Sequence, residues 1–106
     1  MIIRNVHGTV EHACHCESWL DHWRTYSGQR ALYCVVRGCV AKPEVGGHVQ
    51  ERGTSDENIY VIPLCRTCSE KSGQELEIFE GVNLVSINTS VTCGKQLRRE
   101  QAATGR

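Results

Sequence analysis

The chain has 106 residues, including 7 cysteines and 5 histidines, and its 12 basic and 12 acidic side chains give a formal net charge of zero. This length favours one domain with a modest hydrophobic core. Apolar burial alone is a weak source of stability here, because the chain contains only 1 Phe, 2 Trp and 3 Tyr. Neutral net charge argues against a strong, non-specific nucleic-acid binder, which usually has a clear basic excess.

The apolar segments argue against secretion and against membrane insertion. Residues 1–8 contain no apolar stretch long enough for a secretory signal. The longest apolar run, residues 31–36, is far shorter than the ~18 residues of a membrane span. We therefore expect a cytoplasmic protein without a membrane partner, in which thiols stay reduced. An odd number of cysteines also fits a disulfide framework poorly, so metal binding accounts for them better.

A polar lead-in over residues 1–16 is followed by the first predicted element, a helix over residues 17–27. Its large apolar side chains fall on one helical face, and they are Trp19, Leu20, Trp23 and Tyr26. Gly28 stands where a C-terminal cap is expected. This pattern predicts a helix whose aromatic stripe packs on the core.

The middle of the chain predicts short strands and loops. Residues 31–41 suit a hairpin with a tight turn at Arg37 and Gly38. Residues 43–58 are expected to form a loop, because glycines interrupt them repeatedly. A strand over 59–62 should end at Pro63.

The remaining predicted elements complete an α+β domain over residues 1–94. They are a short helix from Cys65 to about Lys71 closed by Gly73, and two short strands over 76–79 and 82–87. Residues 95–106 contain three arginines, one lysine and one glutamate, so we expect a basic, flexible tail.

Two pairs of cysteines have the spacing of metal ligands. Cys65 and Cys68 form a Cys-x-x-Cys pair at a predicted helix start, where the helix N-terminus lowers the pKa of a thiol. Cys34 and Cys39 flank the predicted turn with four intervening residues, within the range seen in zinc sites. Zinc takes four such ligands in a tetrahedron. We therefore predict one structural Zn²⁺ at these four cysteines, in the layout of a treble clef.

Two alternatives to zinc binding remain for these cysteines. A free cysteine often behaves as a small buried apolar residue, and Cys34 lies in an apolar run. A redox Cys-x-x-Cys pair is expected beside a βαβ pattern, which this sequence does not show. Four more candidate ligands could build a second zinc site or could be packed side chains, and they are Cys14, His15, Cys16 and Cys93.

Several motifs resemble known zinc proteins. The segments 44–49 (EVGGHV) and 62–68 (IPLCRTC) resemble the HNH, or ββα-metal, group of treble-clef proteins, over about residues 33–73. In that group His-Val ends a strand and Leu-Cys-x-x-Cys opens a helix, after a zinc-binding cysteine pair. Three further segments are similar, in the same order, to a small bacterial and phage zinc-finger group, and they are 18–23 (SWLDHW), 84–86 (LVS) and 92–94 (TCG).

The resemblance implies a treble-clef, HNH-like core and places His48 at the position of the general base of a nuclease. That base would activate water against a phosphodiester, with Mg²⁺ or Mn²⁺ stabilising the leaving oxygen. Side chains that hold this ion in the family are replaced here by Gly47, Ser69 and Gly73. His48 is therefore a general base, a zinc ligand or an ordinary loop histidine, and we favour a structural role.

The predicted function is a zinc-binding, HNH-like module that binds DNA or RNA and has a degenerate or weak nuclease site. The alternative is a zinc-stabilised adaptor or inhibitor that presents a surface to a protein partner. The two differ in salt dependence, because neutralising phosphates releases counterions whereas an apolar protein interface is far less salt-sensitive.

Overall fold

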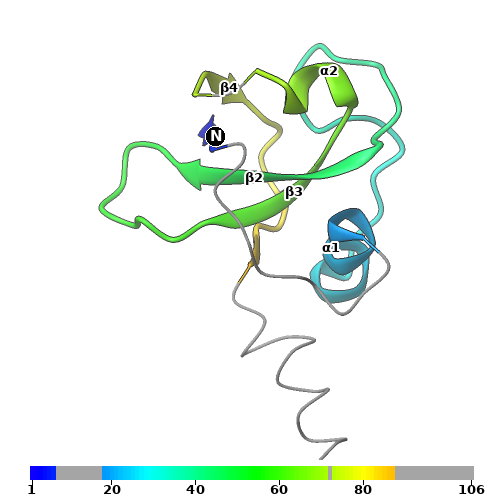
Figure 1. The fold of residues 1–106 in the computed structure, drawn as a ribbon, viewed down its shortest axis with the longest axis horizontal. Coiled ribbons are helices and arrows are strands. Elements are labelled where there is room, and N and C mark those ends of the chain that lie inside the picture. Colours follow the sequence, from blue (N-terminus) through cyan, green and yellow to red (C-terminus); the bar gives the residue numbers. More distant parts are fainter. Residues whose placement is uncertain (7–17, 72, 88–106) are drawn as a thin grey trace, which may run out of the picture.

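The computed structural model describes residues 1–6, 18–71 and 73–87. These residues form a five-stranded antiparallel sheet and two helices, an α+β arrangement (Figure 1). The elements in chain order are β1 (Ile2–Asn5), α1 (Trp19–Ser27), β2 (Val45–Glu51), β3 (Tyr60–Leu64), α2 (Arg66–Ser69), β4 (Glu75–Glu77) and β5 (Val85–Ser86). The strand order is β4-β1-β2-β3-β5, so β2 is the middle strand.

The β2–β3 hairpin separates two buried clusters, one on each face of the sheet. Val49, Ile62 and Leu64 belong to the cluster that contains the cysteines. Val61, between them in sequence, packs with Trp23 of α1 instead. Successive residues of a strand point to opposite faces, so one face carries α2 and the cysteines and the other carries α1. Figure 1 shows the two helices on opposite sides of this hairpin.

Helix α1 confirms the prediction for its segment. The Ser18 side chain caps its N-terminus by accepting a hydrogen bond from the Asp21 amide at 3.0 Å. Gly28 ends the helix in the left-handed region with φ 69°. Leu20 and Trp23 are buried against the sheet, as the aromatic stripe predicted.

Two strands lie where the sequence predicted none. β1 falls within the predicted polar lead-in, and it is held between β4 and β2 with Ile3 and Asn5 buried. β2 falls within the predicted loop over 43–58. Its glycines are required by packing, because a Cβ at Gly46 would come within 2.5 Å of the Trp19 backbone and one at Gly47 would meet the Leu64 side chain. Close packing on both faces of β2 therefore accounts for a glycine pair whose pattern predicted a loop.

The predicted hairpin over residues 31–41 contains no pair of strands, although the Cys34 amide donates to the Ala41 carbonyl across it at 2.8 Å. Its turn is present, with Gly38 at φ 84° and the Cys39 amide donating to the Val36 carbonyl at 3.0 Å. Val36, however, forms an antiparallel bridge with Ile78, in the segment after β4. The segment is thus attached to a distant part of the chain, which local spacing cannot reveal.

Pro63 does not end its strand, because β3 continues to Leu64. The Pro63 carbonyl accepts a hydrogen bond from the Val35 amide at 3.3 Å, on the side of β3 away from β2. In an antiparallel strand the nitrogen of a residue faces the same side as its carbonyl. The missing N–H of Pro63 therefore removes no bond from the β2–β3 ladder.

The later elements are present but shorter than predicted. Helix α2 ends at Ser69, not near Lys71. The last two strands lie at opposite edges of the sheet, with β4 beside β1 and β5 beside β3. Within the described ranges, neither helix is long and apolar enough to cross a membrane. Two further predictions lie outside the described residues. They are the second group of ligands, Cys14, His15, Cys16 and Cys93, and the tail over 95–106.

Candidate metal centre

The four cysteines predicted as ligands meet at one point in the fold. Cys34 and Cys39 come from the segment between α1 and β2, and Cys65 and Cys68 from the junction of β3 with α2. Their sulfur atoms all lie within 4.8 Å of one another, and none is in a disulfide. This cluster could bind a metal ion.

The separation of the thiols fits zinc. Four sulfurs at about 2.3 Å from a tetrahedral ion are about 3.8 Å apart from one another. The sulfurs of Cys39 and Cys65, from two segments far apart in sequence, are 3.8 Å apart. A purely thiolate donor set suits zinc or an iron–sulfur cluster and does not suit magnesium or calcium. The donor set and the distance therefore both fit Zn²⁺.

Local backbone hydrogen bonds hold the ligands in place. The Cys34 amide donates to the Ala41 carbonyl at 2.8 Å, which closes the loop that carries Cys39. Cys65 caps the N-terminus of α2, where its sulfur accepts a hydrogen bond from the Cys68 amide at 3.4 Å. The Cys-x-x-Cys spacing thus works as predicted, because the first helical turn brings the second thiol back to the first.

The thiols differ in their tendency to ionise. Burial raises the pKa of Cys34 and of Cys68. Burial also acts against the Cys65 thiolate, but hydrogen bonds from the Cys68 backbone and from neighbouring thiols outweigh it and lower the pKa of Cys65. A bound cation favours the thiolate form of every ligand. A bound cation would therefore oppose the rise in pKa that burial causes at Cys34 and Cys68.

The cluster is closed to solvent on most sides. Cys34, Cys65 and Cys68 are buried in an apolar cluster, and Cys39 is half-buried. Four protein ligands leave no open position for a substrate, which is typical of structural zinc and not of catalytic zinc. Among the described residues, no other group of three or more Cys, His, Asp or Glu side chains could share a metal.

His48, the predicted candidate base, lies on the other face of the sheet. It occupies the middle of β2 and pairs with Val61, whose side chain packs on α1. Its ring meets the ring of Trp19 edge-on, with 5.1 Å between centroids. His48 is therefore separated from the four cysteines by the β2–β3 hairpin.

His22, to which the sequence patterns assigned no role, is completely buried in the same interface. Its Nε2 atom lies 3.2 Å from the Ser86 carbonyl oxygen, and its ring centroid is 5.0 Å from those of Trp19 and of Tyr26. Burial lowers the pKa of His22, although the Ser86 carbonyl opposes that shift. The sequence did contain a signal for this position, because His22 lies three residues after Trp19 and four before Tyr26 and so falls on the same face of the helix.

The chain matches no protein-family model, no curated protein and no solved structure. The likeness to HNH proteins therefore rests on the motifs and the cysteine spacing.

Proposed function

We propose that the four cysteines bind one Zn²⁺ ion with a structural role, in a treble-clef core. The supporting observation is the convergence of four thiols at zinc-compatible distances, in a site without an open position. Native mass spectrometry tests this on the full chain. A variant with Cys14, Cys16 and Cys93 changed to Ser should keep one zinc, whereas Cys68→Ser should lose it. Retention of stoichiometric zinc by Cys68→Ser would contradict the assignment.

The second part of the proposal is that the zinc-held segment binds nucleic acid. Residues 29–42, here named the knuckle, carry three basic side chains and no acidic one. Arg30, Arg37 and Lys42 are all exposed, and none forms an ion pair with another described residue. Tyr33, between the first two, is 58% exposed. Exposed aromatic rings among unpaired cations are typical of nucleic-acid surfaces, and this observation carries the proposal.

Neutral net charge is compatible with this surface because the knuckle itself contains no acidic residue. The exposed carboxylates of the described residues lie outside the knuckle, and they are Glu44, Glu57, Glu70, Glu75, Glu77 and Glu80. The local field at the knuckle, and not the net charge, governs the encounter with phosphates.

The salt dependence of oligonucleotide affinity tests nucleic-acid binding. Log affinity should fall linearly with log salt, with a slope of about −0.7 to −0.9 per neutralised phosphate. Arg37→Gln should reduce the magnitude of that slope by about 0.7–0.9, the value expected for the loss of one phosphate contact. Arg4→Gln is a matched control, because Arg4 is an exposed arginine of β1, away from the knuckle. Equal effects of both variants would contradict recognition by the knuckle.

For the nuclease part, we propose a degenerate site in which His48 supports packing. The supporting observations are its edge-on contact with Trp19 and its place across the sheet from the cysteines. Mg²⁺- or Mn²⁺-dependent nicking of plasmid DNA would show that a catalytic site is retained.

One observation favours the alternative function, a zinc-stabilised adaptor for a protein partner. Leu32 and Val40 are 79% and 80% exposed and both belong to the knuckle. Exposed apolar side chains gathered in one place often mark protein interfaces. Val40→Ser should leave oligonucleotide binding unchanged if the knuckle binds nucleic acid through its cations and its tyrosine.

A further inference from the structure

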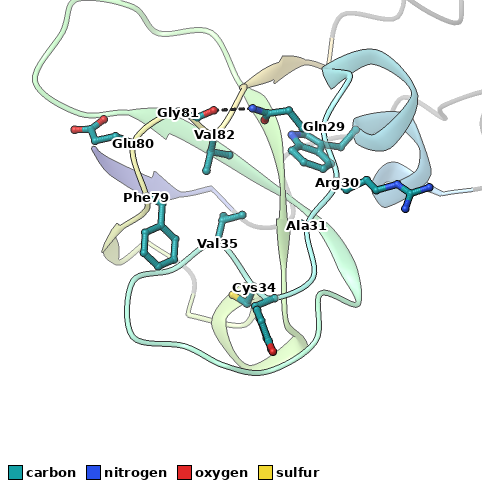
Figure 2. Close-up of a pocket in the computed structure, with 11 residues that line it drawn as sticks. Gln29, Arg30, Ala31, Cys34, Val35, Phe79, Glu80, Gly81 and Val82 are labelled. Carbon is teal, nitrogen blue, oxygen red and sulfur yellow. Dashed lines mark hydrogen bonds between the residues drawn. The ribbon is translucent and has the colours of Figure 1, made fainter.

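A pocket of about 420 Å³ lies between the knuckle and the segment that follows β4 (Figure 2). Its walls are mainly apolar and aromatic, and they include Trp23, Tyr33, Val35, Phe79 and Val82. This size is within the range of small-ligand pockets. The Glu80 carboxylate also belongs to the rim, but it points away from the pocket in Figure 2 and pairs with the Met1 amino group at 3.3 Å.

A second hollow of about 390 Å³ adjoins the first. The two share Gln29, Arg30 and Ala31 as lining residues, so they lie next to each other, and the pair is called the groove below. Arg24 and Arg30 line the second hollow, and no acidic side chain does. Neither arginine forms an ion pair within the described part of the chain. The groove thus joins an apolar compartment to a cationic one.

Hydrogen bonds hold the walls of the groove in position. The Gln29 side chain donates to the Gly81 carbonyl at 2.8 Å, drawn in Figure 2, and accepts from the Asn83 amide at 2.8 Å. The Asn83 side chain donates to the Ser27 carbonyl at 2.8 Å. These bonds join the end of α1 to the segment after β4. Because these walls are already ordered, the entropic cost of ordering them when a ligand binds is small.

We propose that this groove binds one nucleotide unit of a single-stranded nucleic acid, with the base against Tyr33 and Phe79 and the phosphate at Arg24 and Arg30. This inference rests on the proposed nucleic-acid function and names the form of substrate. Phe79 is 47% exposed, and the Arg37 guanidinium lies 5.6 Å from its ring centroid. A nucleotide has a flat base next to an anionic phosphate. The aromatic side chains of the pocket can stack on the base, and the two neighbouring arginines can bind the phosphate. A base within a duplex is stacked and cannot enter such a pocket.

The pocket is also connected to the metal centre. Cys34 lines the pocket and is one of the four clustered cysteines. A metal bound to Cys34 would fix the positions of its sequence neighbours Tyr33 and Val35, which also line the pocket. Loss of the metal should therefore loosen this wall of the pocket. Binding of a nucleotide and binding of zinc should therefore strengthen each other.

Fluorescence anisotropy of the zinc-loaded full chain tests the inference, with a labelled oligothymidylate and a labelled duplex of the same length. Tyr33→Ala should weaken binding of the single strand by ~5- to 150-fold, the range measured for loss of one aromatic–base stack, and should leave duplex binding unchanged. Val40→Ala is the matched control, because Val40 is more exposed than Tyr33 and lies in the same knuckle outside both hollows. Zinc content of each variant reports whether the knuckle is intact.

The outcomes separate this inference from the proposed function. If the single strand and the duplex bind with equal affinity and Tyr33→Ala has no effect, the nucleotide pocket is contradicted. Binding would then be attributed to the knuckle cations alone. No binding of either oligonucleotide would overturn both. Full displacement of the single strand by polyaspartate at equal charge concentration would assign the groove to acidic chains in general. The oligothymidylate should also slow zinc capture by a chromogenic chelator, and an unchanged rate would exclude coupling through Cys34.

Discussion

His48 and Trp19 meet edge-on across the interface between β2 and α1, with their ring centroids 5.1 Å apart. The strand alternation that gives His48 this position also directs its neighbours Gly47 and Val49 towards the cysteine face. The position that resembles a nuclease base is therefore part of the packing between helix and sheet. The cysteine cluster and the histidine belong to different faces of one hairpin.

Replacement of His48 tests its role. His48→Ala should lower the free energy of unfolding by roughly 0.5–3 kcal/mol through lost packing on Trp19, with zinc content unchanged. Denaturant unfolding and metal analysis check both expectations. Loss of a general base would instead reduce nicking by ~10²–10⁴-fold. Clean Mg²⁺-dependent nicking by the natural chain, abolished in this variant with zinc and stability intact, would contradict the packing role.

Gly46 should be intolerant of a side chain. Gly46→Ala would place a Cβ 2.5 Å from the Trp19 backbone carbon, and overpacking of this kind costs about 1–3 kcal/mol. At Gly47 the added Cβ would meet a terminal methyl group of the buried Leu64 side chain, which can shift more readily than a helix backbone, so Gly47→Ala should cost less. Urea unfolding of the two variants compares them. Equal or reversed costs would show that α1 does not approach β2 as closely as described.

The cap of α1 should contribute measurably to stability. Ser18→Ala removes the acceptor for the Asp21 amide, and loss of such a cap costs about 0.5–2 kcal/mol. Thr25→Ala is the control, since Thr25 is exposed within the same helix and alanine favours helix more than threonine does. Thermal unfolding should show a lower midpoint for the first variant only. A neutral Ser18→Ala would argue that the helix begins elsewhere.

The sequence predicted what depends on local spacing. The helix ending at Gly28 follows from an apolar period and a glycine cap, and the two cysteine pairs follow from the geometry of a turn and of a helix start. The features that the sequence patterns did not predict depend on contacts between segments that are far apart in the chain. β1 is a strand because it pairs with β2 and with β4, which are both far from it in sequence. Gly46 of β2 accommodates α1, Gly47 accommodates the Leu64 side chain, and Pro63 is tolerated where the β3 ladder needs no donor.

Stability should depend on pH partly through His22. Burial lowers the pKa of His22 in the folded chain below its ordinary value of about 6.5. The unfolded chain therefore binds more protons, and the contribution of His22 to stability is lost as pH falls below about 6.5. His22→Gln removes this titration and keeps a donor for the Ser86 carbonyl. The difference in melting temperature between pH 7.5 and pH 5.5 should be smaller in His22→Gln, and an identical difference would contradict a buried, neutral His22.

Removal of zinc tests the structural role of the four cysteines most directly. Structural zinc contributes ~10–16 kcal/mol of apparent binding free energy in small domains, which is comparable to or larger than the ~5–15 kcal/mol net stability of a typical protein. Chelation of the purified protein, with metal loss confirmed by mass spectrometry, should therefore collapse the near-ultraviolet circular dichroism of Trp19 and Trp23, although both lie on the opposite face of the sheet from the cysteines. Restored zinc should recover the signal. An unchanged spectrum in the metal-free protein would contradict the proposal that zinc holds this fold together.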